Sequence, residues 1–464
     1  MGEISPSQSV MSMLKIWYKD GVQNLMFRNS PVLKALNKVR VEGKQQNFNA
    51  MYGRGGACSA SFTTARQNAQ NAGKDVEFTV KPGQLFSVYT MNAKEVQASM
   101  TRRGAYMKVA GMKMFAASEA FRKTLAAALY GRGFGEIAVL PSNTATGIET
   151  SGVDLTLPAD AIMKIDVGSW IEFKEEIGSA TSKGTAVVNT INGNKVNVSA
   201  INARFDVAAG DIVCIAGSMD SAGDALLPMG LDGWLPAVEN RTSTEWDAYI
   251  ETPFAGVKRS VCADRLAGAF VVGAGPDKIS KTVQALLLKC RRQGSQADMI
   301  VMNDQDFLEM AGEIEATNTY FTQTSTKEKK QASIGMSAFS ASFSTNFIEN
   351  IIDDPYCPAH KFYILDSSAV ELWSYTNVDK VDDGIAGNNP GKQDPMTMDN
   401  EGKEKEPYAL IIDDYLNVQP GSGSNDGPDV QVTLQFFGSF VVTNPSVCGV
   451  GVLKADTDFI GYTK

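Results

Sequence analysis

One long helix constrains the fold of this chain more than any other feature of its sequence. Residues 104–130, GAYMKVAGMKMFAASEAFRKTLAAALY, are rich in alanine and contain no proline, which favours a helix. At 1.5 Å per residue this helix would measure about 40 Å, well above the average for globular proteins. The helical wheel separates an apolar side, with Met107, Met114, Phe121 and Leu125, from a polar side, with Lys108, Glu119, Arg122 and Lys123.

Three alternating glycines follow this helix, in the sequence GRGFG. A phosphate-binding loop has to open a helix, because the N–H groups that hold the anion lie at the helix N-terminus. Gly131, Gly133 and Gly135 instead follow a helix, where glycine commonly ends it. We interpret the three glycines as a helix end and a hinge.

The segment VEFTVKPGQLFSVYT, residues 76–90, predicts a β-hairpin. Its apolar residues alternate on both sides of a Lys-Pro-Gly-Gln turn at 81–84, as in two half-buried strands. The alternating residues are Val76, Phe78, Val80, Phe86 and Val88. Residues 53–75 before them are small and polar and offer little surface to cover them. Because an isolated hairpin is marginally stable in water, we expect another partner to cover this face.

Residues 150–217 predict an all-β module inserted after the long helix. WIEFKEE, GTAVVNTINGNKVNVSAI and VAAGDIVCIAG follow one another, and Asn192-Gly193 lies between Val188 and Val196. An Asn-Gly pair between alternating apolar residues is a strong hairpin signal. The pattern indicates a small antiparallel barrel or sandwich.

The second half of the chain combines helix and strand patterns. One apolar helix face, which ends at Gly294, consists of Ile279, Val283, Leu286, Leu287 and Cys290. ADMIVMND then predicts a buried strand, and FIENIIDDPYCPAHKFYILDSSAVELWS predicts two strands joined by a turn at 353–355. VQVTLQFFGSFVVTNPSVCGVGVL predicts the closing strands, so the overall class is α+β.

Paired aspartates occur twice, as Asp353-Asp354 and Asp413-Asp414. They could form a two-carboxylate site, but adjacent residues at a strand end point apart, and aspartate is common in turns. We therefore interpret both pairs as turn residues. The second pair lies within residues 377–430, where twelve acidic residues against four lysines predict an acidic surface loop region.

Charge is distributed unevenly along a chain with a formal net charge of −9. Residues 1–54 carry eight basic and three acidic side chains, and residues 101–133 carry seven basic and one acidic. The rest of the chain therefore has a net charge of −20. This segregation suggests that one face meets an anion. The chain has no signal-peptide pattern and no long apolar window, so we expect a cytosolic protein that does not enter a membrane.

The residue types limit the chemistry that the chain can perform. His360 is the only histidine, which excludes a histidine triad, relay or multi-histidine metal site and leaves carboxylate or lysine chemistry open. Cys357 and His360 in CPAH lack further ligands nearby, so a turn before a strand explains them. The six cysteines form no C-x-x-C pair, which predicts reduced thiols. We expect no metal site.

The stretch AGAFVVGAGPDKISKT, residues 267–282, matches the first half of a dinucleotide-binding fingerprint. Asp304, after the next strand, could contact a ribose. Lys278 replaces the third glycine of the motif, however, and the further βα units are missing. A Gly-Pro turn that opens a helix, with Asp277 near the cap, explains the stretch better than a nucleotide-binding enzyme does.

Taken in order, these segments resemble the major capsid proteins of tailed bacteriophages. The succession consists of an N-terminal arm, a long hairpin, a long basic helix closed by glycines, the module strands VGSWIEF, GTAVV and AAGDIV, the segment NDQDFLEMA, and the stretches DPYCP, YILD and GSFVVTNPSVCGV. The resemblance covers essentially the whole chain. It implies an α+β fold with a long spine helix, an extended β-hairpin loop, an axial-domain sheet and an inserted all-β module.

The resemblance also implies a domain order and inter-subunit contacts. The order is an N-terminal arm (1–45), an extended hairpin loop (46–92), a peripheral domain with the spine helix (93–150), the inserted β domain (151–220), an axial domain with its peripheral connector (221–376), an acidic surface loop region (377–430) and closing strands (431–464). The extended loop would lie across a neighbouring subunit, which would then contact its alternating apolar residues. Five basic residues would face packaged DNA through nonspecific phosphate contacts: Lys15, Lys19, Lys34, Lys38 and Arg40.

The function implied is structural, without catalysis or cofactors. Hexamers and pentamers of the chain would assemble in the host cytoplasm into the icosahedral capsid of a virion and enclose double-stranded DNA. Portal, scaffold and decoration proteins would be its partners, with a separate scaffold favoured because no long cleavable N-terminal region is present. A tail-tube or other self-associating virion protein is the alternative, against which the long helix argues, and a nucleotide-binding enzyme is a remote one.

Overall fold

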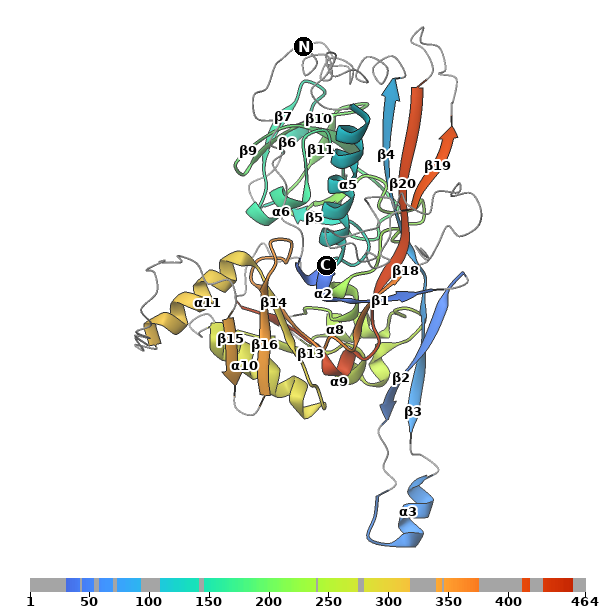
Figure 1. Cartoon of the computed structure of the whole chain (residues 1–464), viewed down its shortest axis with the longest axis vertical. Coiled ribbons are helices and arrows are strands. Elements are labelled where there is room, and N and C mark those ends of the chain that lie inside the picture. Colours follow the sequence, from blue (N-terminus) through green and yellow to red (C-terminus); the bar gives the residue numbers. More distant parts are fainter. Residues whose placement is uncertain are drawn as a thin grey trace, which may run out of the picture. The chain divides into compact units, whose positions relative to one another are not determined.

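The computed structural model describes residues 31–41, 44–53, 58–69, 73–92, 109–141, 146–238, 241–273, 279–317, 339–343, 346–374, 411–417 and 429–453. The chain divides into two compact units, the first drawn from residues 1–29, 84–125 and 374–437 and the second from 30–83, 126–373 and 438–464. Helices and sheets occur without a repeating βα order (Figure 1), which confirms the α+β class. None of the described helices is long and apolar enough to cross a membrane.

The first unit combines the long helix with long strands. Its elements are α5 (Val109–Ala128), which continues into the second unit for its last residues, β4 (Gly83–Asn92), β19 (Ile411–Asn417) and the first part of β20 (Asp429–Val442). β20 pairs antiparallel with β19 and also pairs with β4. The ring of Phe121 packs edge-on against Phe436, with centroids 6.2 Å apart. The apolar side of the helix therefore packs on β20.

The predicted spine helix is confirmed over Val109–Ala128, and residues 104–108 lie outside the described part of the chain. Phe121 and Leu125 are buried, as the helical wheel predicts. Lys123 was assigned to the polar side, yet it is only 5% exposed. That assignment is wrong, because the C-terminal half of this helix is covered on more than its apolar side.

A six-stranded sheet carries the main core of the second unit. Its strands, in spatial order, are β13 (Ala269–Val272), β21 (Gly449–Val452), β17 (Lys361–Leu365), β14 (Met299–Met302), β16 (Asn346–Asp353) and β15 (Phe339–Phe343). β13 and β21 are parallel, as are β14 and β16, and the other neighbours are antiparallel. α10 (Ile279–Arg292) buries its predicted apolar face against this sheet, and α11 (Asp304–Thr317) packs beside it. The resemblance implied a sheet in this part of the chain, and its assignment to an axial domain stays a prediction.

The inserted module has its own core and consists of β-strands with one short helix, so the prediction of an all-β module is wrong in that one element. Its sheet has the order β5 (Glu136–Val139), β12 (Ile212–Ile215), β8 (Trp170–Lys174), β9 (Gly184–Asn192), β10 (Lys195–Ala200) and β7 (Val153–Thr156), and β6 (Thr146–Ile148) pairs with β11 (Phe205–Val207) beside α6 (Ala159–Lys164). All pairs are antiparallel. The predicted hairpin is confirmed with its turn one residue later, at Gly193 and Asn194, where Gly193 has φ 58°.

The module begins earlier than the sequence suggested. Its hydrophobic core includes Ile137, Leu140 and Ile148, which all precede the predicted start at residue 151. Short β5 and β6 segments are separated by residues that the structure does not describe, and neither has a long alternating pattern. Their role becomes visible only through pairing with β12 and β11.

The extended hairpin is present, but its two strands are not the predicted ones. β2 (Gln46–Gly53) pairs antiparallel with β3 (Lys74–Val80), with Phe48 opposite Phe78, and α3 (Phe62–Ala69) lies between them in the sequence. β4, which follows the Lys-Pro-Gly-Gln turn, pairs with β20 instead. The prediction that residues 76–90 form one hairpin is therefore wrong, because period-two alternation identifies strands without identifying their partners.

The remaining elements connect the module, the hairpin and the main sheet. They are α2 (Pro31–Ala35), β1 (Asn37–Arg40), α7 (Leu231–Trp234), α8 (Thr244–Glu251), η1 (Arg259–Val261), α9 (Ala263–Leu266), β18 (Val370–Ser374) and η2 (Pro445–Val447). Arg259 is 1% exposed and donates to Gly233 O at 3.0 Å and to the Tyr249 hydroxyl at 2.8 Å. Its guanidinium also lies 4.2 Å from the Phe254 ring centroid, a cation–π contact that ties the connector together.

Candidate functional site

The base of the extended hairpin is built into the core of its own chain. Phe78 is fully buried, and its ring centroid lies 5.4 Å from those of Phe48 and Trp234. Phe48 in turn lies 5.7 Å from Trp373, and Trp234 lies 4.9 Å from Phe254. We call these five rings the aromatic cluster. Each such pair adds about 1 kcal/mol to the effect of burial alone.

Backbone contacts fasten the same base. Thr79 N donates to Ala255 O at 2.8 Å, and Arg265 Nη1 donates to Tyr52 O. Val80 is buried as well. The expectation that the chain itself offers almost nothing to cover Phe78 and Val80 is therefore wrong, because the cover comes from residues distant in sequence.

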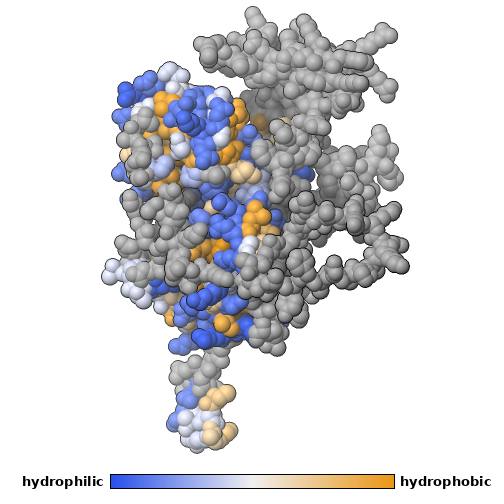
Figure 2. Space-filling view, turned by 90° about the vertical axis from the view of Figure 1, so that its left-hand side faces the viewer, coloured by the Kyte–Doolittle hydropathy of each residue, from blue (hydrophilic) through white to orange (hydrophobic). Residues whose placement is uncertain are grey.

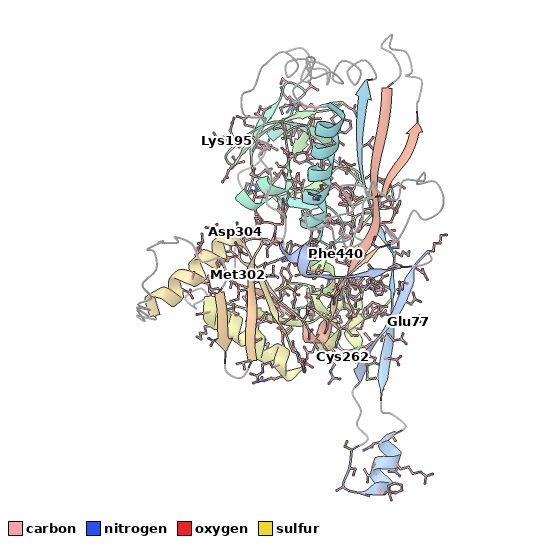
Figure 3. The ribbon with its side chains drawn as sticks, viewed as in Figure 1. Glu77, Lys195, Cys262, Met302, Asp304 and Phe440 are labelled. Atoms are coloured by element: carbon pink, nitrogen blue, oxygen red, sulfur yellow. The ribbon has the colours of Figure 1, made fainter. Side chains whose placement is uncertain are left out.

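The outer part of the hairpin lacks such cover. Met51 is 60% exposed, and α3 contains no buried residue, with Phe62 at 83%. Glu77, labelled in Figure 3, accepts a hydrogen bond from Asn47 Nδ2 at 2.7 Å across the two strands. An eight-residue helix is marginally stable in water on its own, so α3 is a candidate for contact with another subunit, which stays a prediction. α3 was not predicted from the sequence, although Ser61 before it is a typical N-cap.

Two predicted contact residues lie on β4, in the first unit. Phe86 and Val88 are 48% and 50% exposed. The ring of Phe86 packs edge-on against that of Phe437, with 5.7 Å between the ring centroids. A third predicted contact residue, Val76 on β3, is half-buried. Of the five predicted residues, these three keep accessible surface, and their contact with a neighbouring subunit stays a prediction.

The basic residues predicted to face DNA are only partly described. Lys15 and Lys19 lie outside the described residues. Lys34 belongs to α2, and Lys38 and Arg40 belong to β1, but their side chains also lie outside the described part. Their role stays a prediction.

The glycines after α5 end the helix, as predicted. Gly133 and Gly135 have φ values of 86° and 68°, a region that favours glycine. A Cβ at Gly135 would lie 2.8 Å from Ser218 Cβ and 2.9 Å from Leu227 Cδ1. The phosphate-loop interpretation is excluded by this position after the helix, and the hinge stays a prediction.

A carboxylate occupies the position where a dinucleotide phosphate would bind. Ile279 N and Ser280 N, at the start of α10, donate to Glu313 Oε1 and Oε2 at 3.0 and 3.3 Å. An anion bound there would meet a negative charge instead of N–H donors. Asp304 starts α11, and residues 274–278, with Asp277 and Lys278, lie outside the described residues. The geometry argues against a nucleotide site.

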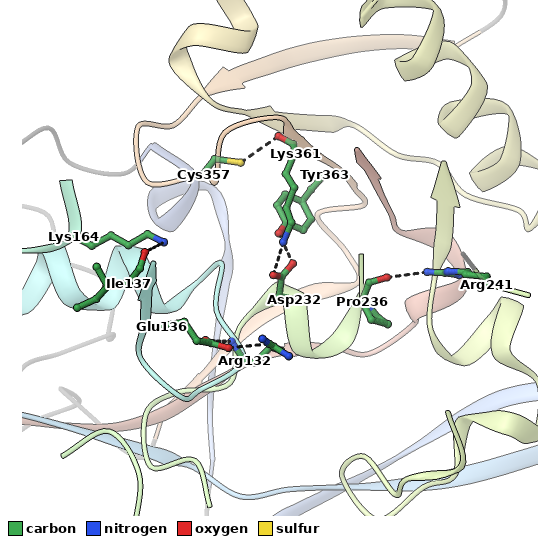
Figure 4. A network of polar contacts seen from close by, with 10 residues as sticks. All are labelled: Arg132, Glu136, Ile137, Lys164, Asp232, Pro236, Arg241, Cys357, Lys361 and Tyr363. Carbon is green, nitrogen blue, oxygen red and sulfur yellow. Dashed lines mark hydrogen bonds and ion pairs between the residues drawn. The ribbon is translucent and has the colours of Figure 1, made fainter. Parts of the chain in front are cut away.

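A buried polar network joins α7 to β17 (Figure 4). Lys361 Nζ lies 2.6 Å from Asp232 Oδ2, and the Tyr363 hydroxyl donates to Asp232 Oδ1 at 2.7 Å. The Tyr130 hydroxyl donates to Asp354 Oδ2 at 2.8 Å. Burial, and then the nearby Asp354 carboxylate, raise the pKa of Tyr130 well above its usual value. Every polar atom named here has a partner, which fits a structural network.

The two neighbouring aspartates point apart, as predicted. Asp354 is fully buried and also accepts from Tyr356 N at 3.0 Å, whereas Asp353 is exposed. They do not form a two-carboxylate site. The side chains of Asp413 and Asp414 on β19 lie outside the described part.

His360 and the cysteines also take structural positions. The His360 backbone N donates to Asp306 Oδ2 at 2.7 Å within the predicted turn before β17. Among the described residues, no group of three or more His, Cys, Asp or Glu could hold a metal. Cys214, Cys290, Cys357 and Cys448 are buried, Cys58 is exposed, and none of the six forms a disulfide.

A cavity of about 450 Å³ lies beside this network. Its charged lining includes ion pairs between Arg132 and Glu136, at 2.8 Å, and between Lys361 and Asp232. Lys164, also on the lining, donates to Ile137 O at 3.4 Å. Two pairs of these charged groups therefore bond within themselves, and Lys164 bonds to a backbone carbonyl.

Comparison with known proteins gives a result at the level of structure. No protein-family model matches the sequence, and no curated protein matches it. A chain of the cyanophage A-1(L) capsid asymmetric unit is 13% identical, with a TM-score of 0.55, over 96% of this chain and 98% of that chain. The capsid of the native GTA particle is 9% identical, with a TM-score of 0.45, over 98% of this chain and 99% of that chain. A structure from Mycobacterium phage Bobi is 10% identical, with a TM-score of 0.41, over 98% of this chain and 100% of that chain. On the first match, this chain has the fold of the major capsid proteins of tailed bacteriophages, as its sequence resemblance predicted.

Proposed function

We propose that this protein is the major capsid protein of a tailed phage, and that it assembles as hexamers and pentamers into an icosahedral shell around double-stranded DNA. The observation that carries the proposal is the likeness to a cyanophage capsid chain over 96% of the sequence. The proposed role is structural.

The outer hairpin is the proposed inter-subunit contact. Phe62, Met51 and the helix α3 expose apolar surface that the described part of the chain does not cover. A neighbouring subunit that covers one such aromatic gains on the order of 2 kcal/mol, and a closed shell repeats that gain at every subunit. Phe86, Val88 and Val76 are further candidates for the same contact.

The remaining parts of the proposal concern partners and location. The two basic segments would line the interior and contact DNA phosphates without sequence preference. The protein would work in the virion capsid after assembly in the host cytoplasm, with portal, scaffold and decoration proteins as partners.

Electron microscopy of the purified protein under assembly conditions tests the proposal. Closed polyhedral shells are the expected product. Tubes would favour the tail-tube alternative, which the long helix α5 opposes, and isolated globular particles under every condition tried would refute self-assembly.

A further inference from the structure

The outer face of the inserted module carries a line of side chains across four neighbouring strands. β8, β9, β10 and β7 lie side by side, and alternate residues such as Ala186, Val188 and Val198 point into the core. The residues between them point outward. This outward line, which we call the ring-and-amide surface, consists of Trp170 on β8, Val187 and Asn189 on β9, Asn197 and Ser199 on β10, and Asp154 on β7.

An exposed indole forms one end of this surface. Trp170 is 57% exposed, whereas the other described tryptophans, Trp234, Trp246 and Trp373, are 1–5% exposed. Trp170 lies opposite Val187, and the turn before it is fixed by hydrogen bonds from Gly168 N to Val188 O (2.8 Å) and from Val188 N to Ser169 O (3.0 Å). The indole is therefore held on a rigid support and is not needed for the core of the module.

A ladder of amide and carboxylate groups forms the other end. Asn189 Nδ2 donates to Asn197 Oδ1 at 3.0 Å, and Asn197 Nδ2 donates to Asp154 Oδ1 at 2.6 Å. The Ser199 hydroxyl donates to Asn189 Oδ1 at 3.4 Å. Each amide has two donors and a carbonyl with two lone pairs, so the ladder orients these groups and keeps hydrogen-bonding capacity for a ligand.

A glycine makes room for the ladder. Gly152 has φ 94°, and a Cβ there would lie 2.8 Å from Asn197 Oδ1 and 3.6 Å from Asn189 Nδ2. Any other residue at this position would push the amides out of line. The backbone beside the ladder thus permits the observed orientation of both asparagines.

The dimensions and chemistry of this surface match a carbohydrate chain. Asn189 is a diagonal neighbour of Trp170 across the strand pair, about 7 Å away, and the four strands span about 14 Å, which exceeds one sugar ring. The C–H face of a pyranose stacks on an indole, and its hydroxyl groups pair with amides and carboxylates. A protein partner would instead need a larger apolar patch around the ring, whereas hydrophilic and hydrophobic residues are interspersed at the module surface in Figure 2.

The negative charge of the module favours a neutral carbohydrate over an anionic one. Residues 136–215 contain ten acidic and five basic side chains. Asp154 lies on the surface itself, and Asp166 and Glu172 flank Trp170 in the sequence. Like charges repel polyanions such as nucleic acids and sulfated glycans. A neutral saccharide carries no such penalty.

We propose that the ring-and-amide surface of the module binds a neutral oligosaccharide chain, with Trp170 stacked on one sugar ring and Asn189, Asn197 and Asp154 bonded to hydroxyl groups. This binding is independent of shell formation, so it can be tested on the unassembled full-length chain.

The test uses cellohexaose, maltohexaose and chitohexaose as probes, with heparin as the anionic comparison. Saturation-transfer NMR of the sugar protons and tryptophan fluorescence report binding. We expect at least one neutral hexasaccharide to bind at millimolar concentration or below. Trp170→Ala should weaken that binding roughly tenfold, Asn189→Ala should weaken it less, and Trp170→Tyr should retain most of it.

Leu308→Ala provides the matched control, because Leu308 is 71% exposed and belongs to α11, which is not part of the ring-and-amide surface. It should leave sugar binding unchanged, and the melting temperature of every variant should match the parent since each altered residue is at the surface. Failure of all three neutral probes to bind at millimolar concentration would overturn the proposal, as would unchanged binding by Trp170→Ala or preferential binding of heparin.

Discussion

Replacing one phenylalanine at the base of the hairpin and one at its tip should separate folding from assembly. Phe78 is fully buried in the aromatic cluster, whereas Phe62 is 83% exposed on α3. Both residues belong to the same hairpin. The two substitutions therefore change the same residue type in one structural element and differ in whether the chain itself covers the ring.

The expected magnitudes differ widely. Phe78→Ser removes a buried ring, and truncations of this kind cost about 3 to 5 kcal/mol. For a large domain this lowers the melting temperature by roughly 10 °C. Phe62→Ser changes a surface residue, for which the effect on stability stays within about 0.5 kcal/mol. Its effect should appear in assembly, where about 2 kcal/mol is lost at every inter-subunit contact.

Thermal melting of the dissociated subunit and electron micrographs of the assembly reaction measure the two effects. Phe62→Ser should melt like the parent and form few or no shells, and Phe62→Tyr, which keeps the ring, should restore assembly. Normal shells from Phe62→Ser would refute the proposed docking of α3. An unchanged melting temperature for Phe78→Ser would refute the assignment of the base to the chain's own core.

Three further predictions follow from charge, topology and burial. Changing Lys15, Lys19 and Lys34 to Glu should leave shells forming with less DNA, since phosphate contacts are lost, and a density gradient separates full from empty particles. A short Gly-Ser linker in place of residues 136–216 should leave a soluble subunit, because Ile215 N donates to Gly135 O at 2.9 Å and the two ends of the module already meet. Removal of residues 152–217 alone would leave β5 and β6 without their pairing partners and should give insoluble protein. Burial raises the pKa of Cys290 from 9.0 to about 12. The neutral thiol therefore contributes fully to the free energy of unfolding below pH 9, and this contribution is lost as the pH rises toward 12. Denaturant unfolding between pH 9 and 12 should show a smaller decrease in the free energy of unfolding for Cys290→Ala than for the parent.

Local patterns predicted the parts of the fold that depend on local chemistry. The apolar face of α10, the buried strand at Met299–Met302 and the hairpin turn near Gly193 all follow from residue spacing within a short window. The outward and inward directions of Asp353 and Asp354 follow from strand alternation in the same way.

Which strands pair, and which residues bury a given apolar side chain, could not be predicted, because both depend on residues far apart in the sequence. β3 pairs with β2 and β4 pairs with β20, although a turn sequence separates β3 from β4 by only two residues. Phe78 is covered by Trp234, more than a hundred residues later. Glu313, which accepts a hydrogen bond at the start of α10, lies 34 residues after Ile279. Alternation indicates that a strand has an apolar face, and it carries no information on which residue meets that face.

The aromatic cluster at the base also bears on assembly, although it lies within one subunit. Ordering a flexible chain costs about 1 to 2 kcal/mol per residue, so a loop that became ordered only on docking would lose far more than one exposed aromatic at its tip contributes. The β2–β3 ladder runs from Gln46 opposite Val80 to Gly53 opposite Lys74, with a register shift between Met51 and Gly53. It removes that cost before subunits meet, because its strands are already paired. A small contact at Phe62 can then act on a preordered hairpin. On this reasoning Phe78→Ser should assemble less well than the parent even at temperatures where it remains folded. A hairpin with a loosened base has to become ordered when it docks, and the entropy lost in that ordering weakens the contact.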